Sequence, residues 1–156
     1  DDLMAIMDNA LNNGYTVAWA SDVSEKGFTR DGIGVVPDNE AIKKASGSDE
    51  ARWIGADPRN PAKTVATPGP ELTITPEMRQ AGYDNYQTTD DHGMHMYGIA
   101  KDQNGTKYYI IKNSWGESGA YKGIWYVSEA FVRYKTMDIL VNKNAIPQEI
   151  RAKLGI

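Results

Sequence analysis

The sequence predicts an α+β fold in which one N-terminal helix precedes about six antiparallel strands, arranged as a half-open barrel or a folded sheet. The helix is predicted by apolar residues at helical spacing near the start of the chain: Leu3, Met4, Met7, Ala10 and Leu11. The strands are predicted by short apolar or alternating segments bounded by glycine, proline and polar residues. Two of these segments flank the polar run at 102–105, which is typical of a β-hairpin loop.

The helix is expected over residues 1–13, and Gly14 is placed to end it. Strands are expected at 15–23 and 33–36. Residues 38–90 are then expected to form a long loop or insertion, because periodicity is weak there and six of the seven prolines lie between Pro37 and Pro76. Within this stretch, Thr75 and Pro76 favour the start of a short helix.

The last third of the chain is expected to be mostly β-structure. Strands are predicted at 92–100 and 107–112, on either side of the hairpin loop. Two more follow at 123–127 and 136–142, separated by a turn of helix over 128–134. All 156 residues are therefore expected to form a single domain.

Composition excludes several classes of function. The net charge of −4 and the absence of a basic stripe argue against a nucleic-acid partner. No apolar run approaches the ~20 residues of a membrane-spanning helix, so no membrane partner is expected. The chain contains no cysteine, which excludes disulfides, thiolate metal sites and thiol chemistry by this chain itself.

The two histidines, His92 and His95, are the first candidates for chemistry. A spacing of three on a strand places the two rings on opposite faces, so no metal site is expected. Asn113 follows His92 by 21 residues across the hairpin, which allows an imidazole and a carboxamide to become neighbours. An amide that orients a histidine base is a recurring part of nucleophilic catalysis. A satisfied core or surface histidine, and a plain strand-end turn at 113–116, are the alternatives.

Several motifs in this region resemble a known family. They are Asp91-His92-Gly93-Met94 with Gly98 six residues after the histidine, the block at 109–116 that ends Asn-Ser-Trp-Gly, and Lys-Gly-Ile-Trp-Tyr at 122–126. Together they resemble the C-terminal half of papain-like cysteine peptidases. Within that family, the segments at 17–23, 116–123 and 141–147 are most similar to the bleomycin hydrolase and aminopeptidase C branch.

The resemblance implies a role for three residues and needs no metal or cofactor. His92 matches the catalytic histidine, Asn113 the residue that orients it, and Trp115 the tryptophan that shields their contact from water. The implied substrate is a peptide, which a cysteine peptidase or aminopeptidase hydrolyses. The branch also implies a homo-hexamer and a cytoplasmic location, although a targeting segment ahead of Asp1 would make a secreted or periplasmic protein.

The missing cysteine leads to the expectation that this chain is the C-terminal part of a longer peptidase and is inactive alone. Its partner would be the N-terminal, cysteine-bearing half of the same protein. The alternative is a naturally cysteine-free, inactive relative that acts as a binding module.

Two further expectations concern local geometry. Ser114 should alternate away from Asn113. The hairpin should be centred between Asp102 and Gln103, because that register sets His92 directly opposite Asn113, whereas a turn at Asn104-Gly105 would set Met96 there.

Overall fold

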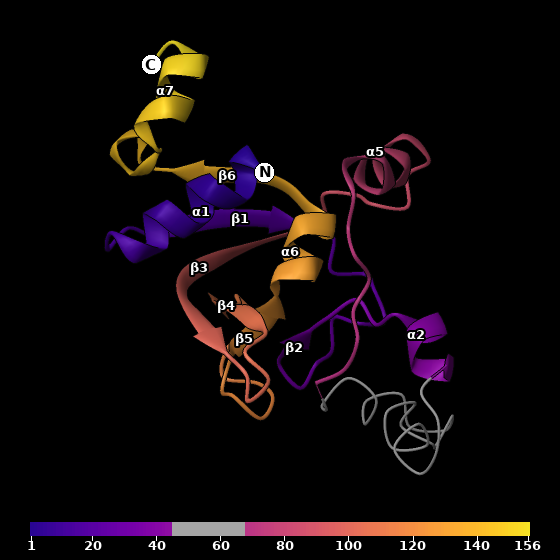
Figure 1. Ribbon diagram of the computed structural model, residues 1–156. Helices are drawn as coiled ribbons and strands as arrows, with labels where there is room; N and C mark the ends of the chain where they lie inside the picture. Colours follow the sequence, from indigo (N-terminus) through magenta and orange to yellow (C-terminus); the bar gives the residue numbers. More distant parts are fainter. Residues whose placement is uncertain (45–67) are drawn as a thin grey trace.

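The computed structural model describes residues 1–44 and 68–156, and its central feature is a six-stranded sheet (Figure 1). The strand order is β2-β5-β4-β3-β1-β6. The bounds are β1 Val17–Ser21, β2 Ile33–Gly34, β3 His92–Lys101, β4 Lys107–Lys112, β5 Ile124–Ser128 and β6 Thr136–Val141. The predicted α+β class is confirmed, and all six strands lie where the sequence predicts them, within a few residues.

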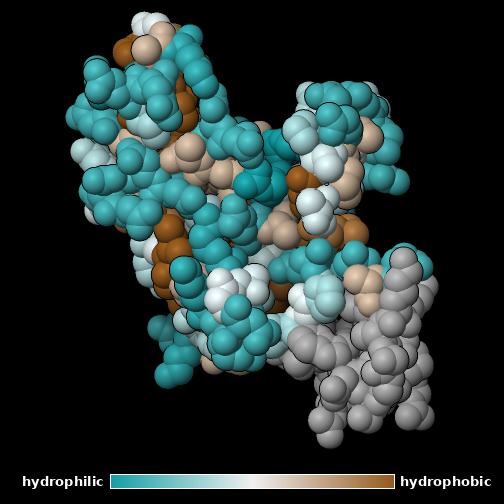
Figure 2. All heavy atoms as spheres, viewed as in Figure 1, coloured by the Kyte–Doolittle hydropathy of each residue, from teal (hydrophilic) through white to brown (hydrophobic). Residues whose placement is uncertain are grey.

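Two helices pack on the core face of this sheet. They are α1 (Asp2–Asn12), which buries Met4, Met7 and Ala10, and α6 (Glu129–Lys135), which buries Phe131 and Val132. The sheet contributes the largest buried side chains, among them Trp19, Tyr109 and Trp125. Hydrophilic residues cover most of the face seen in Figure 2, with hydrophobic side chains between them in narrow strips.

Further short helices surround this core: α2 (Asn39–Lys44), α5 (Pro76–Asp84), η1 (Lys143–Ala145) and α7 (Gln148–Leu154). The predicted helix start at Thr75 is confirmed, since the Thr75 side chain accepts a hydrogen bond from the backbone N–H of Met78 at 3.2 Å. The other three were not predicted, because each is too short to show a clear period.

The long 38–90 segment is more regular than the sequence suggested. It contains α2 and α5, and residues 70–72 lie against residues 36–38, where Asp38 N–H donates to the Pro70 carbonyl at 2.9 Å and Leu72 N–H to the Val36 carbonyl at 3.0 Å. Its middle part, 45–67, lies outside the described residues.

The sheet is antiparallel except at one edge. Strand β2 pairs with β5 in parallel, with Ile33 opposite Tyr126 and Gly34 opposite Val127. The expectation of a wholly antiparallel sheet is wrong here. A two-residue strand carries too little pattern to show its direction.

The expected hairpin register is also wrong. Lys101 pairs with Lys107, so the loop is centred on Asn104, and Met96 lies opposite Ile111. The pairing then shifts by one residue between Met96 and Gly98. This β-bulge leaves Tyr97 as the extra residue. No such irregularity can be read from apolar spacing, and it changes the register that the loop would otherwise impose.

Candidate active site

His92 and Asn113 are joined by a hydrogen bond, with 2.8 Å between His92 Nε2 and Asn113 Oδ1. His92 is the first residue of β3, and Asn113 directly follows β4. The pairing of His95 with Lys112, continued by one step, sets Met94 opposite Asn113. The contact therefore runs diagonally across two strands, and side chains of this length can span that separation.

The hydrogen bonds of Asn113 define which nitrogen of His92 carries the proton. Asn113 Oδ1 also accepts the backbone N–H of Ser114 at 2.7 Å, and a backbone N–H can only donate. The amide oxygen is thereby fixed on the side of the imidazole, so His92 Nε2 must be the N–H that donates to it. Nδ1 of neutral His92 is then unprotonated and free to accept a proton.

Trp115 covers the imidazole. Its indole ring stacks on the His92 ring with centroids 4.8 Å apart and planes 29° apart. The same indole stands edge-on to Trp125 at 5.5 Å and to Phe28 at 6.2 Å. Asn113 is only 3% exposed, whereas Trp115 is 45% exposed. The indole thus lies between solvent and the hydrogen bond, and removing water strengthens such a bond.

The loop that follows β4 holds Asn113 in place. The Asn113 backbone N–H donates to the Gly123 carbonyl at 3.0 Å, and the Gly123 N–H donates to the Ser118 carbonyl at 2.7 Å. Gly123 has a φ of +84°, and a Cβ there would lie 2.2 Å from the Gly116 carbonyl oxygen. Only glycine allows this closure of the loop. The Asn113 Nδ2 group is buried and has no hydrogen-bond partner among the described residues.

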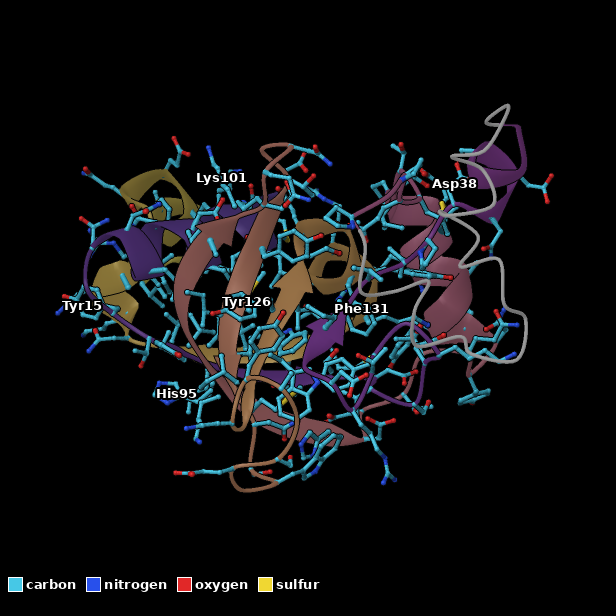
Figure 3. The ribbon with its side chains drawn as sticks, turned by 90° about the horizontal axis from the view of Figure 1, so that it is seen from below. Tyr15, Asp38, His95, Lys101, Tyr126 and Phe131 are labelled. Carbon is cyan, nitrogen blue, oxygen red and sulfur yellow. The ribbon has the colours of Figure 1, made fainter. Side chains whose placement is uncertain are left out.

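His95 lies on the opposite face of the sheet. It is exposed, pairs with Lys112, and points away from the sheet in Figure 3. It lines a hollow of about 400 Å³ together with Ala20 and Leu140, and Asn113 and Ser114 also contribute to the lining. The two histidines are separated as their spacing predicts.

Ser114 does not follow its expected orientation. Its hydroxyl oxygen lies 3.5 Å from His92 Nε2, and its backbone N–H binds Asn113. The expectation assumed strand alternation, but β4 ends at Lys112, so the alternation no longer applies at position 114.

The sequence did not predict the residues that pack against the Trp115 indole. Phe28 and Trp125 support the Trp115 indole, and Trp125 Nε1 donates to the Thr29 carbonyl at 2.8 Å. Trp125 is present in the motif at 122–126, but nothing in the spacing connects it with Phe28, which is almost 100 residues away.

No group of three or more His, Cys, Asp or Glu residues in the described part of the chain is placed to hold a metal ion. Within residues 1–44 and 68–156, no helix is long and apolar enough to cross a membrane.

Comparisons with known proteins relate the chain to a peptidase family. The model of the Peptidase C1-like family matches residues 71–155, which include the whole candidate site. Among solved structures, PepW from Lactobacillus rhamnosis HN001 superposes with a TM-score of 0.61 at 19% identity, covering 98% of this chain and 28% of its own. The bromelain protease from Ananas comosus, solved with the E64 inhibitor, gives 0.42 at 14% identity, covering 91% of this chain and 46% of its own. No match was found among curated proteins.

Proposed function

The chain belongs to the Peptidase C1-like family and has a papain-like fold, and from that premise we propose that it supplies the base and its orienting amide to a thiol peptidase site. His92 is the general base, Asn113 orients it, and Trp115 shields their contact. The observation that carries this proposal is the 2.8 Å bond from His92 Nε2 to Asn113 Oδ1 beneath the Trp115 indole.

The proposed chemistry uses the free nitrogen of His92. With Nε2–H held by Asn113, Nδ1 accepts the proton of a cysteine thiol and gives a thiolate–imidazolium pair. The neighbouring imidazolium keeps the thiol pKa low, so the cysteine is a thiolate, and therefore a nucleophile, at neutral pH. The thiolate attacks the peptide carbonyl, and the imidazolium then donates its proton to the leaving amine.

The nucleophile must come from elsewhere, because none of the 156 residues is a cysteine. We propose that a separate polypeptide segment, the cysteine-bearing half, packs beside His92. The chain spans 28% of the PepW chain. That it forms the C-terminal part of a longer peptidase is part of this proposal. Aminopeptidase specificity, a hexameric assembly and a cytoplasmic location are proposals that rest on the sequence resemblance.

The test uses the protein encoded by the complete reading frame that contains Asp1. An aminoacyl fluorogenic substrate should be hydrolysed, iodoacetamide should abolish turnover, and H92A should have the same effect. A complete reading frame with no cysteine, or turnover that survives H92A, would refute the proposal. The first result would instead favour a cysteine-free binding module.

A further inference from the structure

His92 is weakly held by the sheet. As the first residue of β3 it pairs with Ser21 of β1, but pairing of β3 with β4 begins only at His95. The residues before it, 85–91, form no helix or strand. The position of the imidazole therefore depends on what fixes this incoming segment.

A buried ammonium group fixes the segment that leads to His92. Lys135, the last residue of α6, is 2% exposed, and its Nζ donates to the Gln87 carbonyl at 3.2 Å and to Thr88 Oγ1 at 3.1 Å. The ammonium also forms an ion pair with the Glu25 carboxylate and lies 4.4 Å from the centroid of the Tyr134 ring. All three donors of the ammonium are thus used, two of them on the segment that leads to His92.

A second buried charge holds the other side of the same segment. Asp22, 1% exposed, accepts the backbone N–H of Thr89 at 3.2 Å and is bound by Ser24. One residue before His92, the Asp91 carboxylate accepts the Val23 N–H at 2.9 Å. Burial raises the pKa of Asp22, but the Ser24 and Thr89 bonds and the Lys135 charge outweigh it and hold that pKa below its usual value. We call residues 21–25, 87–91 and Lys135 the lysine junction.

The lysine junction joins three elements at one point. The Lys135 carbonyl accepts the Ser21 hydroxyl at 2.9 Å and the Asp22 N–H at 3.1 Å, so the end of α6 is tied to the end of β1. Buried ion pairs add little net stability compared with apolar packing, because desolvation of the charges costs about as much as their attraction returns. Directional bonds from one fixed ammonium do, however, define a position.

We propose that Lys135 is a positioning residue for His92: by fixing Gln87 and Thr88 it sets the place where the imidazole meets Asn113. The inference rests on the proposed role of His92 as the base. Only a small displacement of the imidazole is tolerated, because a shift of about 1 Å lengthens the 2.8 Å contact between His92 and Asn113 beyond hydrogen-bond range. Asn113 is held independently, from β4 and its following loop, so movement of the junction affects one partner only.

The test uses the imidazole NMR signals of this chain, which has only two histidines. In the K135M variant, the His92 Nε2–H should exchange with water roughly fivefold faster or more, as expected for a weakened hydrogen bond. The ring-current shift that the Trp115 indole imposes on His92 should also fall. His95, on the opposite face, should not change. K153M is the matched control, since Lys153 forms an exposed ion pair with Asp2.

A folded K135M protein with unchanged His92 signals would overturn the proposal, and so would equal changes at His92 and His95, which indicate general loosening. If K135M does not fold, T88V is used instead, because it removes only one acceptor of the ammonium. The same changes in the His92 signals are then expected, and their absence would overturn the proposal. The readout involves no peptide hydrolysis. Absent turnover would therefore refute the proposed function without touching this result.

Discussion

His92 and His95 offer a matched pair of substitutions three positions apart. In the complete protein, H92A should lower kcat on the order of 10²–10⁴-fold, the usual effect of losing a general base. H95A should leave kcat within a few-fold, because its ring lies on the other face of the sheet. Steady-state kinetics of both variants on one substrate measures this. Loss of activity in H95A alone would mean that the base has been misassigned.

Trp115 is expected to act through the bond that it covers. W115A exposes the His92–Asn113 contact to water, and kcat should fall roughly tenfold, since a neutral bond and a ring contact each contribute on the order of 1 kcal/mol. L154A is the control, because Leu154 is 58% exposed and lies on α7, away from the site. Equal activity of W115A and L154A would show that shielding is unimportant.

Glu71 gives a prediction about pH. Burial raises its pKa, despite hydrogen bonds from Ser128 Oγ at 2.6 Å and the Val36 N–H at 2.8 Å. The folded state thus binds a proton more tightly than the unfolded state, so this contribution to stability is full below the unfolded pKa of about 4.5 and is lost as pH rises through the folded value.

E71Q removes that titration while keeping an acceptor. Urea unfolding should show that the stability of E71Q, relative to the unsubstituted protein, increases from about pH 4 to about pH 7. This interval begins below the ordinary glutamate pKa of about 4.5 and ends well above it. A difference that stays constant over this interval would contradict the raised pKa.

At the scale of elements, α5 depends on its N-cap. T75A should destabilise the protein by about 1 kcal/mol, because the Met78 N–H loses its acceptor, whereas T75S should cost little. Urea unfolding of both variants tests this. The α5 helix precedes the lysine junction, so a T75A protein should also show the His92 signals slightly displaced.

The elements also show what the sequence could and could not predict. The elements α1, α5 and β1 form where expected, because each has a local sequence pattern: apolar spacing from Leu3 to Leu11, a capping residue at Thr75, and alternation in β1. The contact of His92 with Asn113 was expected from a motif and a hairpin, yet the hairpin has another centre. A bulge at Tyr97 and the support of Trp115 by Phe28 depend on tertiary packing, which leaves no periodic signal.

At the scale of the whole molecule, the isolated chain should not hydrolyse peptides. Ser114 Oγ lies 3.5 Å from His92 Nε2, but that nitrogen carries the proton donated to Asn113 and cannot accept another. A fluorogenic assay of the pure chain should give no turnover above that of S114A. Hydrolysis that disappears in S114A would mean that the serine is activated after all.

The pairing of β1 with β6 has a consequence for how this protein folds. Val17 lies opposite Val141, and Asn9 Nδ2 donates to the Ala145 carbonyl at 2.6 Å, so the first strand meets the last across most of the chain. Contacts of such long sequence separation close large loops and slow folding. During synthesis, the edge of β1 that pairs with β6 therefore stays unpaired until β6 has emerged from the ribosome, even after β3 has paired with the other edge.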